Sequence, residues 1–108
     1  MTAKIYRSKQ ARADILQCFV YLAENAGIAI AERFLKNTQL SFELLSQNPL
    51  IGSQLKLKNP KLAEIRKWRV SNFSNILIFY IQRKDSISIL RVLHAAQDWW
   101  ELLGLDLP

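Results

Sequence analysis

Cysteine, glycine, proline and histidine are all scarce in this chain. Its 108 residues include one cysteine, one histidine, three glycines and three prolines. The single thiol, Cys18, cannot form an internal disulfide, which predicts a reducing, cytoplasmic location. No linker, repeat or low-complexity segment is visible, so we expect one domain over residues 1–108.

Long apolar runs are also missing. The run Ile76–Ile81 is far shorter than the roughly 18 residues that span a bilayer. Met1–Lys4 leads into no long apolar stretch, which predicts that there is no signal peptide. Half of the residues are nevertheless hydrophobic, so the chain can build a core and global disorder is excluded.

Few residues are suited to catalysis or metal binding. One histidine, His94, cannot build a metal site, and no Cys, Asp or Glu cluster has ligand spacing, so no metal or cofactor is expected. The sequence has no glycine-rich phosphate loop and no carboxylate pair placed for acid–base catalysis. We favour His94 as a hydrogen-bonded residue at a strand end, with a general base as the alternative. Cys18 lies on an apolar stripe and is expected in the core.

Positive charge is abundant and concentrated. The chain has 15 basic and 9 acidic residues, a net charge of +6. One acid, Glu64, lies between Ser53 and Arg69, where the basic residues are Lys56, Lys58, Lys61, Arg66, Lys67 and Arg69. Such a patch favours phosphates or an acidic protein surface as a partner. The alternative is an ordinary solvated loop.

Helical spacing dominates the first half of the chain. Lys4–Arg7 is a short candidate strand, and Ser8 is a plausible helix N-cap. An amphipathic helix is predicted to follow and to end at Gly27, which suits the left-handed position after a helix. Its apolar stripe is Ile15, Cys18, Phe19, Leu22, Ala23 and Ala26. A second helix is predicted over about 28–46, with the stripe Ala31, Phe34, Leu35, Thr38, Phe42 and Leu45.

The second half reads as strands. Three candidates, at about 63–70, 75–82 and 86–94, are separated by short turns and predict an antiparallel meander. The segment after these strands, Ala95–Leu103, is predicted to form a short helix. The fold class is therefore α+β with the order β-α-α-β-β-β-α, in which a helical hairpin covers one face of a small antiparallel sheet. The run Ile76–Ile81 needs a strand that is covered on both faces.

Individual strand residues have two interpretations. Arg66, Trp68 and Val70 should share one face of their strand, opposite Ile65, Lys67 and Arg69. Arg66 and Arg69 either extend to solvent at a sheet edge or bind phosphate or carboxylate groups. Arg91 lies in an apolar strand and needs either a partner such as Asp98 or Glu64, or an opening to a ligand. Trp99 is expected in the core and Trp100 in an exposed apolar patch.

Taken together, the segments resemble the RelE/ParE superfamily of type II toxins, and its ParE branch in particular. The resemblance rests on the helical hairpin, Asn48–Gly52, Ile65–Val70, Phe73–Tyr80 and Ile89–Asp98. It implies a toxin that inhibits DNA gyrase without a cofactor and is neutralised by a ParD-like antitoxin, through which alone DNA is contacted. It implies antitoxin binding at Trp68 and Trp100. Target binding is expected at Lys56, Lys58, Arg66, Lys67, Arg69 and Arg91.

RelE-like relatives cleave mRNA on the ribosome, and this is the alternative function. It requires cations around the phosphate and a group that transfers protons. The terminal tyrosine usual in that pattern is missing, which favours gyrase and leaves His94, with Arg66 and Arg91, as the catalytic candidates. Gln97 stands where ParE sequences commonly have arginine, which bears on toxicity and on the choice of target. A third reading is an inactive toxin retained in an autorepressor complex.

Overall fold

The computed structural model describes residues 3–55 and 64–97. Its elements are β1 (Lys4–Arg7), α1 (Lys9–Asn25), α2 (Ile28–Gln47), β2 (Ser53–Gln54), β3 (Ile65–Val70), β4 (Phe73–Gln82) and β5 (Ser86–His94). The predicted α+β class and the order of these elements are confirmed, except that β2 was not predicted. Most of the predicted last helix, with Asp98, Trp99 and Trp100, lies outside the described residues. Its first positions, 95–97, form turns instead.

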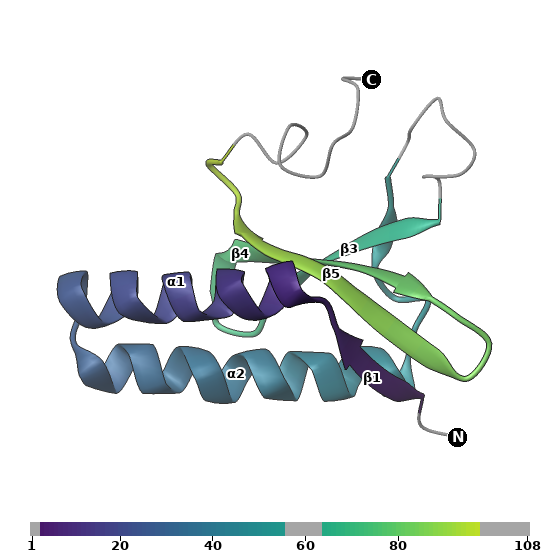
Figure 1. The fold of residues 1–108 in the computed structure, drawn as a ribbon, viewed down its shortest axis with the longest axis horizontal. Helices are drawn as coiled ribbons and strands as arrows, with labels where there is room; N and C mark the ends of the chain where they lie inside the picture. The colour runs from purple at the N-terminus through teal and green to yellow at the C-terminus, as the bar shows by residue number, and fades with distance from the viewer. Residues whose placement is uncertain (1–2, 56–63, 98–108) are drawn as a thin grey trace.

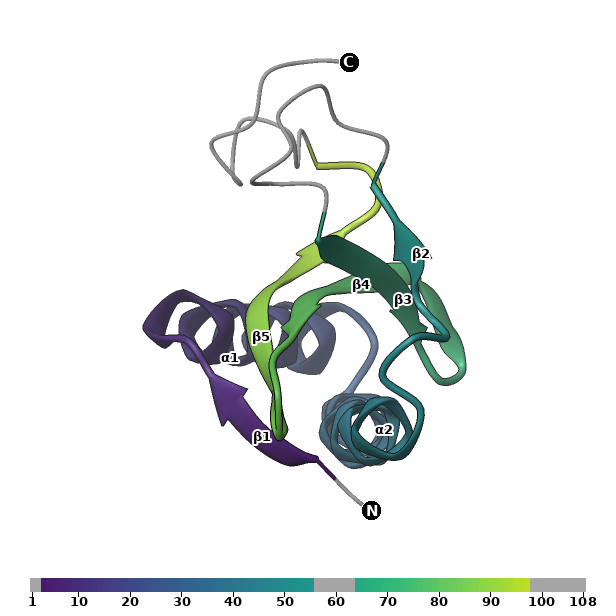
Figure 2. The ribbon, with the colours of Figure 1, turned by 90° about the vertical axis from the view of Figure 1, so that its right-hand side faces the viewer.

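The sheet has five strands in the order β1-β5-β4-β3-β2. Strands β3, β4 and β5 form the predicted antiparallel meander, whereas β1 pairs with β5 in parallel. The helical hairpin makes this parallel pairing possible, because parallel neighbours need a long connection. Both helices lie on the same face of the sheet (Figures 1 and 2). Neither described helix combines the length and apolar character that crossing a membrane requires.

Local signals set the ends of the helices. The Ser8 hydroxyl accepts a hydrogen bond from the Ala11 N–H at 2.9 Å, which confirms Ser8 as the N-cap of α1. The same hydroxyl donates to the Leu90 carbonyl at 2.7 Å and so fixes the start of α1 against β5. Gly27 has a φ of 101° between α1 and α2. This value favours glycine and confirms the predicted break in the hairpin.

Strand β4 is buried on both faces. Ile76, Ile78 and Tyr80 belong to the main core under the helices. Their neighbours Leu77 and Phe79 point to the opposite face and join a second buried cluster with Leu55, Ile65 and Leu93. The apolar run in the sequence therefore reports a strand covered on two sides, as predicted.

The apolar stripes of the helices match the predictions only in part. Five of the six residues in the α2 stripe are buried: Ala31, Phe34, Thr38, Phe42 and Leu45. Leu35 is 40 % exposed, so it does not share the buried face of the other stripe residues. It lies about 100° around the helix from Phe34 and falls on the flank of the stripe. In α1 the fully buried residues are Ala11 and Asp14, while Cys18 is half-buried.

Tyr80 fixes the segment between α2 and β2 by two hydrogen bonds. The Tyr80 hydroxyl accepts a hydrogen bond from the Gly52 N–H at 3.0 Å and donates to the Pro49 carbonyl at 2.7 Å. Burial raises the pKa of Tyr80 and keeps the hydroxyl protonated, as the second bond requires. A Cβ atom at Gly52 would lie 2.5 Å from the Tyr80 hydroxyl oxygen. Only glycine therefore fits at this position.

We predict that Gly52→Ala lowers the free energy of unfolding by about 2–3 kcal/mol, because the buried, rigid tyrosine ring cannot move aside. Urea denaturation followed by circular dichroism measures the change. Ser53→Ala, at an exposed neighbouring position, is the control and should change stability by less than about 0.5 kcal/mol. Equal stability of the two variants would contradict the described packing.

Candidate functional site

Two concave surfaces lie between the helices and the sheet. The first, which we name the α2 groove, has a volume of about 570 Å³. It is lined by Leu40, Ser41, Leu44, Trp68, Arg69, Val70, Ser71, Asn72 and Ser74. The second, which we name the α1 pocket, has a volume of about 690 Å³. Both volumes fall in the range of ligand and peptide sites.

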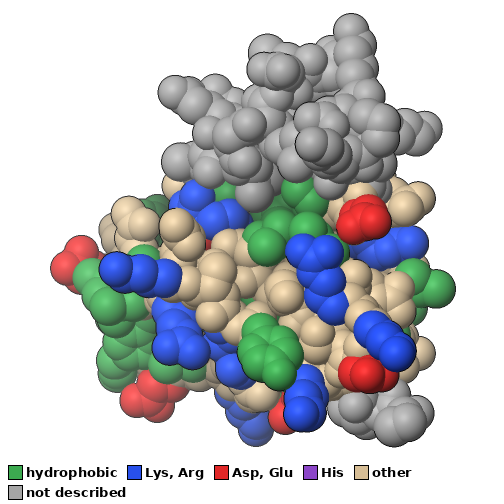
Figure 3. Space-filling model, turned by 45° about the vertical axis from the view of Figure 1, so that its right-hand side comes forward, with side chains coloured by type: hydrophobic (Ala, Val, Ile, Leu, Met, Phe, Trp, Pro, Cys, Tyr) green, Lys and Arg blue, Asp and Glu red, His purple; other side chains and the backbone are tan. Residues whose placement is uncertain are grey.

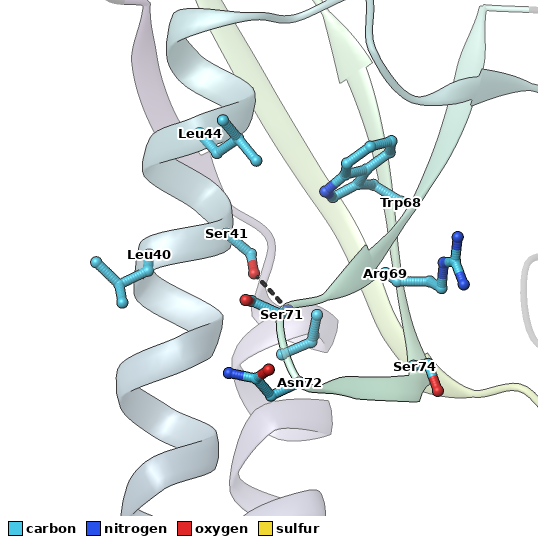
Figure 4. Close-up of a pocket in the computed structure, with 9 residues that line it drawn as sticks. Leu40, Ser41, Leu44, Trp68, Arg69, Ser71, Asn72 and Ser74 are labelled. Carbon is cyan, nitrogen blue, oxygen red and sulfur yellow. Dashed lines mark hydrogen bonds between the residues drawn. The ribbon is translucent and has the colours of Figure 1, made fainter.

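Leucines of α2 form one wall of the α2 groove. Leu40 and Leu44 are one turn apart and are 48 % and 42 % exposed. Trp68 on β3 points toward them across the groove (Figure 4). Between the two walls, the Ser41 hydroxyl accepts a hydrogen bond from the Ser71 N–H at 2.9 Å and ties α2 to the turn after β3. The result is an exposed apolar surface on a fixed frame.

The turn from β3 to β4 separates the two concave surfaces. Asn72 in this turn has a φ of 65°, a left-handed conformation that asparagine tolerates better than most residues. Asn72 and Ser74 line both the α2 groove and the α1 pocket. The turn is therefore a shared rim between two neighbouring surfaces.

The α1 pocket lies between α1 and the ends of β4 and β5. Its apolar lining comes from Cys18, Tyr21, Leu22, Phe73, Ile76, Val92 and Leu93. Its polar lining comes from Asp14, Gln17, Asn72, Ser74, Asn75, Arg91, His94 and Gln97. Tyr21 is 61 % exposed at its edge. Burial is the main cause of the raised pKa of Cys18, and the Asp14 charge adds to it, so this thiol is not an activated nucleophile.

An ion pair between α1 and β5 contributes to the lining of the α1 pocket. Arg91 donates from Nε to Asp14 Oδ2 at 2.7 Å and from Nη2 to Asp14 Oδ1 at 2.8 Å. Asp14 Oδ2 also accepts the Val92 N–H at 3.0 Å. These hydrogen bonds raise the pKa of Arg91, and burial opposes them in part. An internal partner for Arg91 was one of the two predicted alternatives, but Asp14 was not among the predicted acids.

Arg66 is engaged by the backbone. Its Nη1 atom donates to the carbonyl oxygens of Leu50 at 3.2 Å and Gly52 at 2.7 Å. It therefore helps Tyr80 to fix the segment before β2. In the view of Figure 4, Arg69 lies on the far side of β3 from α2 and is exposed. Trp68 packs against the main core and is half-buried, consistent with the predicted alternation along β3.

His94 is exposed at the end of β5. Its Nδ1 atom accepts a hydrogen bond from the Ala96 N–H at 3.0 Å. Its backbone N–H donates to the Gln97 side-chain oxygen at 2.8 Å. The neutral ring therefore carries its proton on Nε2, because Nδ1 is used as an acceptor.

The structure divides the predicted site residues into groups. Arg91 and His94 line the α1 pocket, and Trp68 and Arg69 line the α2 groove. Three of the predicted residues, Lys56, Lys58 and Trp100, lie outside the described residues. On the face in Figure 3, Lys and Arg side chains are spread out, with acidic side chains between them. Among the described residues on that face, Lys and Arg side chains do not gather into a single dense patch.

Sequence reasoning missed Asp14, Gln17 and Tyr21. Asp14 could have been predicted to pair with a cation, because a carboxylate on the buried side of an amphipathic helix requires a partner. No group of three or more potential metal ligands occurs among the described residues. The two surfaces offer apolar contacts and hydrogen bonds from neutral side chains, together with the exposed Arg69 in the α2 groove and the Asp14–Arg91 pair in the α1 pocket.

We predict that Asp14→Asn lowers the free energy of unfolding at pH 7 by about 3 kcal/mol. The amide removes the negative charge and presents N–H groups to donors that need an acceptor. Thermal and urea denaturation measure the change, with Glu24→Gln on the exposed side of α1 as the control. A loss in Asp14→Asn as small as that in Glu24→Gln would contradict a stabilising role for the ion pair.

The sequence profile of the family described as "ParE toxin of type II toxin-antitoxin system, parDE" matches residues 5–99. No curated protein sequence matches the chain. Among solved structures, the chain is similar to one described as the chromosomal ParDE TA system from P. aeruginosa. That match has 15 % identity and a TM-score of 0.70 and covers 86 % of this chain and 96 % of the other.

A second similar structure is the conserved hypothetical protein HP0894 from Helicobacter pylori. It has 19 % identity and a TM-score of 0.53, and the match covers 88 % of this chain and 97 % of the other. At these identities the two structures support the fold, and the profile match over most of the chain supplies the family. This chain therefore belongs to the ParE toxin family of type II toxin–antitoxin systems.

Proposed function

We propose that this ParE-family toxin acts in the cytoplasm by binding DNA gyrase, and that a ParD-like antitoxin holds it inactive. The main support for this proposal is that the candidate catalytic arginines already have hydrogen-bond partners within the fold. Arg91 forms an ion pair with Asp14, and Arg66 donates to two backbone carbonyls. Cleavage of RNA needs cations directed at the phosphate. Protein binding has no such requirement.

The environment of His94 also favours a binding function. A general base needs a lone pair that is free to accept a proton from the attacking hydroxyl. The Nδ1 lone pair of His94 already accepts the Ala96 N–H. The neutral ring therefore offers an N–H donor at Nε2, which suits hydrogen bonding rather than proton abstraction.

The α2 groove fits an amphipathic segment of the antitoxin. Leu40 and Leu44 are exposed one turn apart, and Trp68 faces them. A helix that buries aliphatic side chains in a groove uses this kind of surface. Trp68 was predicted to bind the antitoxin, and its position in this groove supports that role.

We predict that expression of this chain without its antitoxin stops DNA synthesis before protein synthesis and produces filamentous cells. Pulse labelling with thymidine and methionine, together with microscopy, measures the order of the two effects. A gyrase inhibitor stalls replication while translation continues. Early collapse of protein synthesis would contradict this proposal and favour the ribosome-dependent mRNA endonuclease.

We predict that Leu44→Arg weakens antitoxin binding at least about ten-fold, because it places a charge in the apolar wall of the groove. Isothermal titration with a purified ParD-like antitoxin measures the affinity. Leu35→Arg is a matched control, since Leu35 and Leu44 are 40 % and 42 % exposed on the same helix and only Leu44 lines the groove. Equal affinities of the two variants would exclude the α2 groove as the docking site.

A further inference from the structure

The α1 pocket is a second surface with a different chemistry from the α2 groove. The structure assigns Arg91 and His94 to the α1 pocket and Trp68 to the α2 groove. Arg91 was predicted to bind the target, and Trp68 was predicted to bind the antitoxin. His94 was a catalytic candidate in the alternative mRNA-cleaving function, and Arg69, a further predicted target-binding residue, lines the α2 groove. The two surfaces share only Asn72, in the β3–β4 turn, and Ser74, at the start of β4. This separation provides one surface for each partner.

The rim of the α1 pocket is rich in neutral hydrogen-bonding groups. Its exposed amide and hydroxyl side chains are Gln17, Asn72, Ser74, Asn75 and Gln97. The charged groups Asp14 and Arg91 neutralise each other at 2.7 Å. A phosphate or an acidic peptide is attracted by clustered positive charge, which this rim does not supply. Peptide backbone, with its alternating N–H and C=O groups, suits neutral amide partners.

The edge of β5 points to an extended ligand. Strand β1 pairs with β5 only as far as Ile89. Beyond Ile89, side chains accept hydrogen bonds from N–H groups at this edge of β5. Asp14 accepts the Val92 N–H and Gln97 accepts the His94 N–H. Such caps protect a strand edge from unwanted pairing. The Asp14 cap is buried and ion-paired, whereas the Gln97 cap is exposed and replaceable.

We propose that the α1 pocket is the site where this toxin binds its target, and that it takes an extended, uncharged peptide segment of the target protein. A carbonyl of that segment replaces the Gln97 side chain at the His94 N–H. One apolar side chain of the segment enters the pocket beside Tyr21 and Leu22. This inference rests on the proposed function, because it requires a protein target.

The role of the His94 backbone gives a sharp test. His94→Pro removes the edge N–H, whereas His94→Ala keeps it and removes only the imidazole. We expect His94→Pro to require at least about ten-fold more protein for growth arrest, which is the size expected for a lost central contact. We expect His94→Ala, which loses a pocket side chain but keeps the edge N–H, to lose much less toxicity than His94→Pro. Equal losses of toxicity in the two variants would overturn the inference, because the imidazole and not the backbone N–H would then account for the effect.

A second pair of variants keeps the test valid if His94→Pro fails to fold. Tyr21→Arg places a charge at the edge of the pocket. Leu16→Arg changes an equally exposed residue of α1 that does not line it, since Tyr21 and Leu16 are 61 % and 64 % exposed. We expect Tyr21→Arg to reduce toxicity at least about ten-fold and Leu16→Arg to leave it unchanged. Equal toxicity of the two variants would overturn the inference.

Antitoxin binding separates this inference from the proposed function. Tyr21→Arg, and His94→Pro as long as it folds, should bind the antitoxin within about two-fold of the wild type. Tyr21→Arg, at an exposed position, should also keep the wild-type melting temperature. Loss of antitoxin binding in both variants would overturn the inference, because the pocket would then belong to the antitoxin. Absence of growth arrest by the wild-type chain would instead reject the proposed function, and this inference with it.

Discussion

The hydrogen bonds of the buried Asp14 carboxylate are the interactions on which the packing of α1 against the sheet depends. The carboxylate receives two hydrogen bonds from Arg91 and one from the Val92 N–H. It thereby fixes α1 to β5, satisfies an edge N–H that no described strand takes up, and neutralises a cation in an otherwise apolar strand. The polar end of the α1 pocket is consequently rigid and electrically balanced. A surface of this kind selects partners by shape and hydrogen bonding.

Two of the basic residues that suggest nucleic-acid binding in the sequence have other uses in the fold. Arg91 balances Asp14, and Arg66 holds the carbonyls of Leu50 and Gly52. Guanidinium groups that are already hydrogen-bonded in this way contribute little to phosphate recognition. The apolar surfaces remain as the features that can distinguish partners. The α2 groove offers exposed leucines, and the α1 pocket offers an aromatic edge with neutral amides.

Much of the fold could be predicted because its signals are local. Ser8 and Gly27 mark helix ends by their own side-chain and backbone chemistry, and Ile76–Ile81 reports a strand buried on both sides. The Asp14–Arg91 pair joins residues 77 positions apart, so no local pattern could assign it. Parallel pairing of β1 with β5 and the two-residue strand β2 likewise depend on tertiary contacts. The two concave surfaces form only when α1 and α2 pack on the sheet, which explains why Tyr21 and Gln17 were missed.

The most direct test asks whether the two protein partners use two separate surfaces. It compares amide hydrogen exchange of the toxin alone, of the toxin with its antitoxin, and of the toxin with purified gyrase. We expect the antitoxin to slow exchange in residues 40–44 and 68–71, the part of the α2 groove that the α1 pocket does not share. We expect gyrase to slow exchange in residues 17–22 and 91–97, which belong to the α1 pocket. Protection of these segments by both partners alike, or no protection by gyrase, would contradict the use of two separate surfaces.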